Sequence, residues 1–118
     1  WTKWEDCAAS ILCTVVSNAV PGKCVLDAGT KTFAADLLRG GEGHGLIVEY
    51  PDAPIIRLTE EHAEVDLSSC SARPKLGERV SVIPNHICPC VNLQDTVWLH
   101  GESGDLEPVP VDARGKLS

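Results

Sequence analysis

The sequence predicts a mostly β protein, in which the strands of one domain form a small antiparallel β-barrel or a curled sheet. Short apolar or alternating segments recur at intervals of about 8 to 12 residues, with turn signals between them. The 118 residues are enough for one domain with a single small core. That core must rest on Val, Leu, Ile and Ala, because the chain has only one Phe and one Tyr.

The individual elements follow from local patterns. Residues 8–16 are apolar and rich in β-branched side chains, which predicts a long buried strand. A short strand at 23–26 follows a Pro-Gly turn, and one or two helical turns are predicted at 32–38, before a Gly-rich stretch. Further strands are predicted, in order, at residues 45–49, 55–58, 62–67, 79–83, 96–100 and 107–111, with 112–118 as a tail.

Charge and hydropathy exclude two classes of function. The formal net charge is −7, and Lys and Arg never form a run, whereas nucleic-acid binding needs clustered cations to neutralise phosphates. No segment approaches the roughly 20 apolar residues of a membrane-spanning helix. We therefore expect neither a nucleic-acid partner nor a membrane partner.

The six cysteines allow two interpretations. An even number is compatible with a disulfide framework. Against this, Cys13 and Cys24 lie in apolar, strand-like segments, where a thiol behaves as a small hydrophobic side chain, and the cysteine spacings do not repeat. We expect reduced thiols and a cytoplasmic protein, with the disulfide framework as the alternative.

The most informative segment for chemistry is the run around His86 and Cys88. In extended backbone, residues i and i+2 point to the same face, so both side chains could reach one ion. A closed structural zinc site needs four protein ligands, whereas one pair predicts a metal that stays partly open. Imidazole with thiolate favours zinc over magnesium or manganese. The alternative is a histidine at a strand end beside a buried cysteine. The sequence leaves three roles open for Cys90: a third metal ligand, a weak hydrogen-bond donor, or a small buried residue.

Five segments in this order resemble the C-terminal domain of the D-serine dehydratase and D-threonine aldolase family, and the match covers roughly residues 10 to 115. They are Leu26-Asp27-Ala28-Gly29-Thr30-Lys31, Gly43-His44-Gly45 with Glu49-Tyr50-Pro51, Thr59-Glu60-Glu61-His62, Leu76-Gly77-Glu78-Arg79-Val80, and Pro84-Asn85-His86-Ile87-Cys88-Pro89-Cys90-Val91-Asn92-Leu93.

The resemblance implies the antiparallel β-domain that follows a pyridoxal phosphate-binding α/β barrel in a larger two-domain enzyme. The abrupt start at Trp1 agrees with an excised domain. Pyridoxal phosphate would then be bound mainly by the missing barrel, which carries the Schiff-base lysine, so we expect Lys31 not to play that part and the isolated chain to be inactive. The full-length enzyme is expected to be a homodimer.

The resemblance also implies the reaction. His86 and Cys88 stand at the family's metal ligands, and a cysteine at the second position is typical of the dehydratases, where the aldolases carry aspartate. The expected function is zinc-dependent β-elimination from a β-hydroxy D-amino acid such as D-serine. The alternatives are a retro-aldol lyase of the D-threonine aldolase type, and a non-catalytic dimerisation or lid domain with a vestigial metal pair.

Other side chains in the resembling segments are candidates for supporting roles. Glu60, Glu61 and His62 offer a general base or a carboxylate that orients the metal-bound imidazole, and His62 is the preferred catalytic residue. The alternative is a solvated strand end. Asp27 and Lys31 face the cofactor or a dimer interface, or they belong to a turn that caps a strand.

Overall fold

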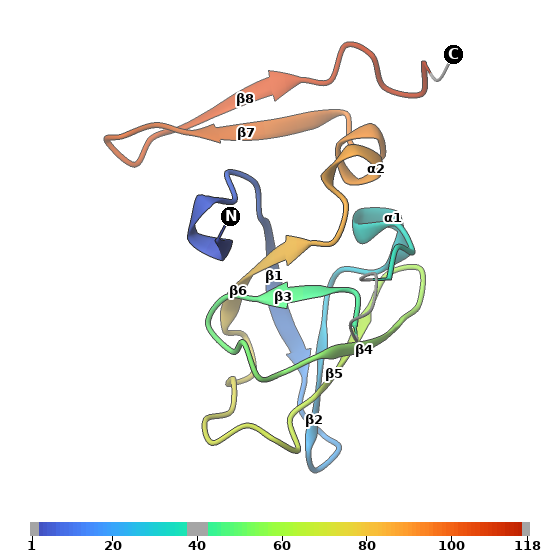
Figure 1. The fold of residues 1–118 in the computed structure, drawn as a ribbon, viewed down its shortest axis with the longest axis vertical. Helices are drawn as coiled ribbons and strands as arrows, with labels where there is room; N and C mark the ends of the chain where they lie inside the picture. Colours follow the sequence, from blue (N-terminus) through green and yellow to red (C-terminus); the bar gives the residue numbers. More distant parts are fainter. Residues whose placement is uncertain (1–2, 38–42, 117–118) are drawn as a thin grey trace.

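The computed structural model describes residues 3–37 and 43–116, and it confirms the mostly β fold (Figure 1). Six antiparallel strands form one curled sheet in the order β3-β6-β1-β2-β5-β4, and β7 and β8 form a separate two-stranded sheet. The strands are β1 Ile11–Ser17, β2 Lys23–Leu26, β3 Gly45–Ile47, β4 Ile55–Leu58, β5 Ala63–Asp66, β6 Arg79–Pro84, β7 Thr96–His100 and β8 Leu106–Pro110. The helices are η1 Trp4–Asp6, α1 Thr30–Phe33 and α2 Ile87–Asn92.

Strand β1 organises the sheet because it pairs on both edges. Cys13 lies opposite Val80 of β6, and Val15 lies opposite Leu26 of β2. The side chains of β1 alternate as a half-buried strand requires, since Cys13 and Val15 are buried whereas Leu12 is exposed. At the two edges of the sheet, the His44 N–H donates to the Ile55 carbonyl (3.1 Å), so the curled sheet is nearly closed into a barrel.

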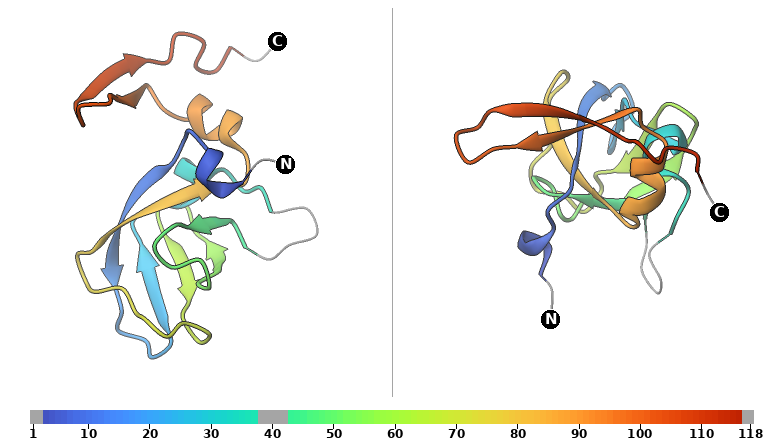
Figure 2. Two further views of the ribbon diagram at one scale, coloured as in Figure 1. Left: turned by 60° about the vertical axis from the view of Figure 1, so that its left-hand side comes forward. Right: turned by 90° about the horizontal axis from the view of Figure 1, so that it is seen from above.

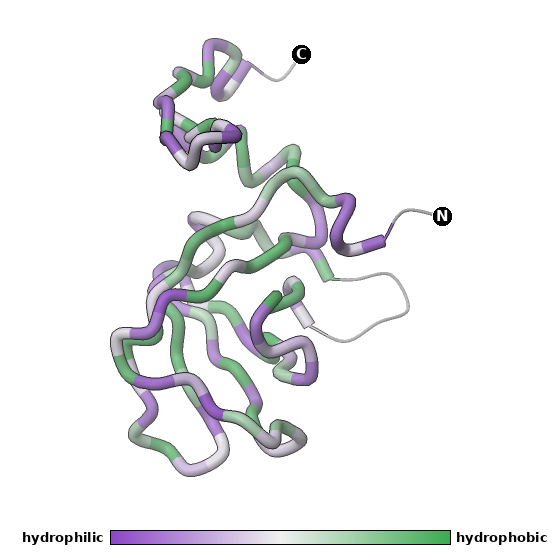
Figure 3. Tube along the Cα trace, turned by 90° about the vertical axis from the view of Figure 1, so that its left-hand side faces the viewer, coloured by the Kyte–Doolittle hydropathy of each residue, from purple (hydrophilic) through white to green (hydrophobic). Residues whose placement is uncertain are grey.

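The core is small and aliphatic, as the composition predicts. Hydrophobic residues run along the strands of the six-stranded sheet, and many of the turns are hydrophilic (Figure 3). The buried residues are Cys13, Val15, Cys24, Leu26, Ala28, Phe33, Ile47, Ala53, Ile55, Ala63, Val65, Leu67, Val80, Val82 and Cys90.

The strand pairing brings four of the five family-like segments to one end of the barrel. Strands β2 and β6 both pair antiparallel with β1, so they run parallel to each other and their carboxyl ends lie at the same end. The start of β3 pairs with the end of β6, and the β4–β5 turn joins this end because β5 is antiparallel to β2. Helices α1 and α2 follow β2 and β6, and they lie together there (Figure 2).

Two local predictions are wrong. The helical segment is a single turn, Thr30–Phe33, rather than the predicted 32–38, of which residue 38 lies outside the described part. The run after His86 is the helix Ile87–Asn92 and not extended backbone. Pro89 is compatible with this helix because it occupies the first turn, where its missing N–H has no intrahelical acceptor.

The β7–β8 hairpin lies apart from the six-stranded sheet, on the far side of α2 (Figure 1). It presents large apolar side chains to solvent, including Trp98, Leu99 and Leu106. The sequence located both strands to within one residue but did not reveal that they form a sheet of their own.

In the part of the chain that the structure describes, no helix is long and apolar enough to cross a membrane.

Gly29 provides the first test of this arrangement. A Cβ atom at Gly29 would lie 2.5 Å from the Glu60 carbonyl oxygen and closer still to that of Thr59, so backbone would have to move. We expect Gly29→Ala to lower the free energy of unfolding by about 2 kcal/mol or more and Tm by roughly 5 °C or more. Thermal unfolding followed by circular dichroism measures this change.

Gly101→Ala is the matched control, because a Cβ atom there would meet nothing closer than 3.6 Å. Equal losses of stability in the two variants would contradict the importance of the close approach at Gly29.

The buried thiols predict alkaline sensitivity. Burial raises the pKa of Cys13 from 9.0 to about 12 and that of Cys24 from 9.0 to about 11. Because the folded chain holds these protons more tightly than the unfolded chain, stability is fully present below about pH 9 and is lost as the pH rises toward those values. Each thiol contributes a slope of up to about 1.4 kcal/mol per pH unit.

Urea unfolding at pH 7.5, 9 and 10.5 measures the loss. The Cys13→Ala/Cys24→Ala double variant should be less stable at neutral pH but lose less stability between pH 9 and 10.5. A slope unchanged by the double substitution would assign the alkaline loss to other groups.

Candidate metal centre

His86 is positioned by the strand that precedes it. Strand β6 pairs with both β1 and β3 and ends at Pro84, so only Asn85 separates a firmly held strand from His86. His86 is the N-cap of α2 and keeps extended backbone angles (φ −148°, ψ 108°). The histidine is thus fixed at the junction between the barrel and the helix.

The imidazole of His86 has a carboxylate partner. Its Nδ1 lies 2.8 Å from Oδ2 of Asp36, a residue 50 positions earlier in the chain that follows α1. The sequence suggested Glu60 or Glu61 for such a carboxylate, and Asp36 was missed. Nothing in the local sequence marks Asp36, because it lies outside the family-like segments.

Cys88 lies in the first turn of α2, and it is exposed. Because the backbone is helical from Ile87, the prediction that His86 and Cys88 share one face of extended chain is wrong. The two residues are still only two positions apart at the exposed start of one helix.

The donor set fits a zinc ion. The bond to Asp36 engages Nδ1 of His86 and leaves Nε2, and the exposed Cys88 supplies sulfur, so a borderline-soft metal is favoured. Within residues 3–37 and 43–116, no three His, Cys, Asp or Glu side chains are grouped closely enough to hold a metal. A two-donor site formed by His86 and Cys88 therefore stays a prediction.

Cys90 has a structural position. It is 3% exposed, and its thiol donates to the carbonyls of Phe33 (3.3 Å) and His86 (3.1 Å). Burial raises the pKa of this thiol. Of the three roles that the sequence left open, the contacts match a small buried residue that donates hydrogen bonds, and the thiol ties α2 to α1.

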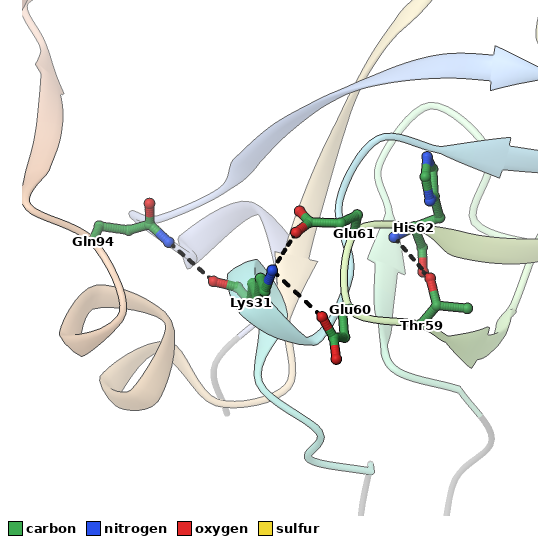
Figure 4. Close-up of polar contacts among 6 residues, drawn as sticks. All are labelled: Lys31, Thr59, Glu60, Glu61, His62 and Gln94. Atoms are coloured by element: carbon green, nitrogen blue, oxygen red, sulfur yellow. Dashed lines mark hydrogen bonds and ion pairs between the residues drawn. The ribbon is translucent and has the colours of Figure 1, made fainter.

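Glu60 and Glu61 pair with Lys31 (Figure 4). The Lys31 Nζ lies 2.5 Å from Glu61 and 3.4 Å from Glu60, and the hydrogen bond to Glu61 raises the lysine pKa. Gln94, just after α2, donates to the Lys31 carbonyl at 3.5 Å. These exposed contacts join α1, α2 and the β4–β5 turn.

His62 lies at the β4–β5 turn, where its backbone N–H donates to the Thr59 hydroxyl at 3.1 Å. Figure 4 shows its imidazole directed away from Lys31, and the side chain is exposed. The structure therefore brings His62 to the same end of the barrel as His86, but on a different element.

Asp27 makes two hydrogen bonds to strand β1. Its carboxylate accepts the Thr14 N–H at 2.6 Å, and its own N–H donates to the Thr14 carbonyl at 3.1 Å. These contacts match the strand-capping alternative for Asp27.

All six cysteines are free, which agrees with the expectation of reduced thiols.

Known proteins similar to this chain include short and long ones. This chain is 35% identical over 115 residues to an uncharacterised protein of Mycobacterium tuberculosis, and the match covers 94% of this chain and 86% of that protein. It is 33% identical over 116 residues to the 3-hydroxy-D-aspartate aldolase of Paracoccus denitrificans, covering 97% of this chain but only 27% of the aldolase.

Solved structures share the fold. The D-threonine aldolase of Filomicrobium marinum superposes with a TM-score of 0.76 at 30% identity, over 92% of this chain and 29% of the aldolase. The D-threo-3-hydroxyaspartate dehydratase of Delftia sp. HT23 gives 0.72 at 22% identity, over 90% of this chain and 32% of the dehydratase. The chain thus corresponds to about one third of each enzyme.

The family model described as "Putative serine dehydratase domain" matches residues 8–100, which is most of the chain. This match confirms the resemblance that the five motif segments indicated. The longer proteins that are similar to this chain include D-amino acid aldolases and dehydratases. The chain belongs to the serine dehydratase-like domain family.

Proposed function

We propose that this chain is the metal-carrying β-domain of a pyridoxal phosphate- and zinc-dependent lyase that removes the β-hydroxyl group of a D-amino acid, as in D-serine dehydratase. The observation that carries the proposal is the start of α2, where His86 has its Nδ1 engaged by Asp36 and is followed by the exposed thiol of Cys88. The alternative reaction is retro-aldol cleavage of the D-threonine aldolase type.

Two solved variants of a D-threo-3-hydroxyaspartate dehydratase support the metal assignment. One has a histidine replaced by alanine, and the other has the cysteine two positions later replaced by alanine and is described as metal-free. The spacing equals that of His86 and Cys88 in this chain. Sulfur at the second position favours zinc, and the family resemblance associates a cysteine there with the dehydratases rather than the aldolases.

The residues of this chain would divide the work. When bound, zinc would supply Lewis acidity, and pyridoxal phosphate, held mainly by a preceding barrel domain, would stabilise negative charge at the α-carbon. Nε2 of His86 and the thiolate of Cys88 would hold the metal and leave positions for substrate oxygens. His62, exposed at the β4–β5 turn, is our candidate for moving a proton at the substrate.

The proposed partners follow from the coverage of the relatives. Since the chain matches 27% of the aldolase of P. denitrificans, we propose that it works against its own N-terminal barrel in a homodimer, with a D-amino acid as substrate. The cytoplasm is the proposed location, and the six free cysteines support it.

One observation favours a second candidate function. The chain covers 86% of the mycobacterial relative, so that protein has no room for a fused barrel. A domain of this family can therefore exist as a short polypeptide, which supports a non-catalytic dimerisation or lid domain with a vestigial metal pair. The zinc content of the purified protein separates the two candidates, since a vestigial pair would leave it free of metal.

Zinc binding is the central test. We expect one zinc per chain at most, held weakly, because only two protein donors are assigned. His86→Ala and Cys88→Ser should abolish binding, whereas Cys88→Asp should weaken zinc and improve the relative binding of manganese, since a hard oxygen replaces sulfur. Competition with a chromophoric chelator measures these affinities.

Cys90→Ser is the matched control, because serine can still donate to the carbonyls that Cys90 contacts. If Cys90→Ser loses zinc as completely as Cys88→Ser, the two-donor site is wrong.

The isolated chain should be inactive toward D-serine even when zinc and pyridoxal phosphate are added, because the proposed cofactor lysine belongs to the barrel. Lys31 is paired with Glu60 and Glu61 at the surface. The measurement is pyruvate formation from D-serine. Pyruvate formation that disappears in Lys31→Ala would place the cofactor lysine in this chain and overturn the domain assignment.

A further inference from the structure

We propose that Asp36 is a positioning residue for the metal, because it fixes which nitrogen of the His86 ring faces the ion. This inference rests on the proposed role of His86 as a zinc ligand and adds to it a residue from a distant part of the chain. The observation is the 2.8 Å contact between Nδ1 of His86 and Oδ2 of Asp36.

Which of the two atoms carries the hydrogen follows from the chemistry of the imidazole and the carboxylate. An ionised carboxylate can only accept, so Nδ1 must carry the hydrogen in this contact. In a neutral imidazole the other nitrogen, Nε2, then keeps its lone pair. A metal needs that lone pair, and ligating histidines commonly donate their second ring nitrogen to a carboxylate in this way.

Asp36 is itself held in place by hydrogen bonds from the segment that contains His86. Asn85, the residue before His86, donates its side-chain amide to the Asp36 carbonyl and to the Gly43 carbonyl, both at 3.0 Å. Cys90 donates to the carbonyls of Phe33 and His86. The two segments are therefore connected on both sides of the carboxylate–imidazole contact, and Asp36 meets the ring in a defined place.

Exposure separates a positioning role from a stabilising one. The side chains of His86 and Asp36 are 55% and 49% exposed, and a pair so open to water contributes little to folding stability. Removing the Asp36 carboxylate should consequently change which nitrogen of the His86 ring carries the proton, and it should change the zinc affinity, while the fold persists.

The first readout needs no metal. Imidazole ¹⁵N NMR of the zinc-free protein should show His86 with the proton on Nδ1, and Asp36→Ala should shift it toward Nε2. Asp36→Asn keeps the size of the side chain but can present either its Oδ1 acceptor or its Nδ2 donor to the ring, so it should give a mixture of the two tautomers. A His86 ring that remains protonated at Nδ1 in Asp36→Ala would overturn the proposal.

The second readout is zinc affinity by chelator competition. Asp36→Ala should bind zinc about 10- to 100-fold more weakly, and Asp36→Asn should lose less. Asp105→Asn, which removes the same charge at the tip of the β7–β8 hairpin, is the control and should bind as the unaltered chain does. Unchanged affinity in Asp36→Ala, or an equal loss in Asp105→Asn, would overturn the proposal.

The proposed metal site and the proposed positioning role of Asp36 are contradicted by different results. If His86→Ala leaves zinc binding unchanged, the proposed metal site is wrong, whatever Asp36 does to the tautomer. If His86→Ala abolishes binding and Asp36→Ala has no effect, the metal site stands and the positioning role of Asp36 is wrong. Unfolding curves of each variant check that the fold is intact.

Discussion

The geometry of the candidate site depends on the hydrogen bonds that fasten the start of α2 to the chain leaving α1. The buried Cys90 thiol reaches the Phe33 carbonyl, and the Asn85 amide reaches the Asp36 carbonyl. A six-residue helix is too short to be stable by itself, so its place is set by such contacts. Without them, His86 would sit at the end of a strand with no defined partner for its ring.

The barrel makes this meeting of segments possible. Because β1 pairs on both sides, β2 and β6 run in the same direction and deliver α1 and α2 to the same end. The β4–β5 turn is fixed there as well, since the N–H groups of Thr30 and Lys31 donate to the carbonyls of Thr59 and Glu60. Gly29 permits this approach because a side chain would collide with the turn. The family-like motifs thus divide between those that hold the scaffold and the His86–Cys88 segment, which we propose as the metal site.

A two-donor metal site at an exposed helix start suits a domain that completes an active site formed elsewhere. His86 and Cys88 lie at the surface, where a metal that they hold would be accessible from solvent. In the long relatives a further two thirds of the chain is available to face such a site, whereas the mycobacterial relatives are little longer than this domain. Sequences similar to this chain are therefore found in proteins of two different sizes.

The sequence by itself determined the β class and the approximate position of every strand in the described residues, and it singled out the His86–Cys88 pair, whose metal-binding role stays a prediction. Each of these depends on neighbouring residues: alternation and turn residues are local, and two donors two positions apart are visible in any backbone. It also identified the family, because short motifs in a fixed order survive without a structure. It failed at 87–92, where Pro89 suggested broken extension although proline fits the first turn of a helix.

Only the tertiary structure decided which side chains meet. Asp36 reaches His86 across 50 residues, and Cys90 reaches Phe33 across 57. No local pattern encodes these contacts, because they follow from the parallel course of β2 and β6 on either side of β1. The separation of the β7–β8 hairpin from the barrel is of the same kind, since a strand's sequence does not state which sheet it will join.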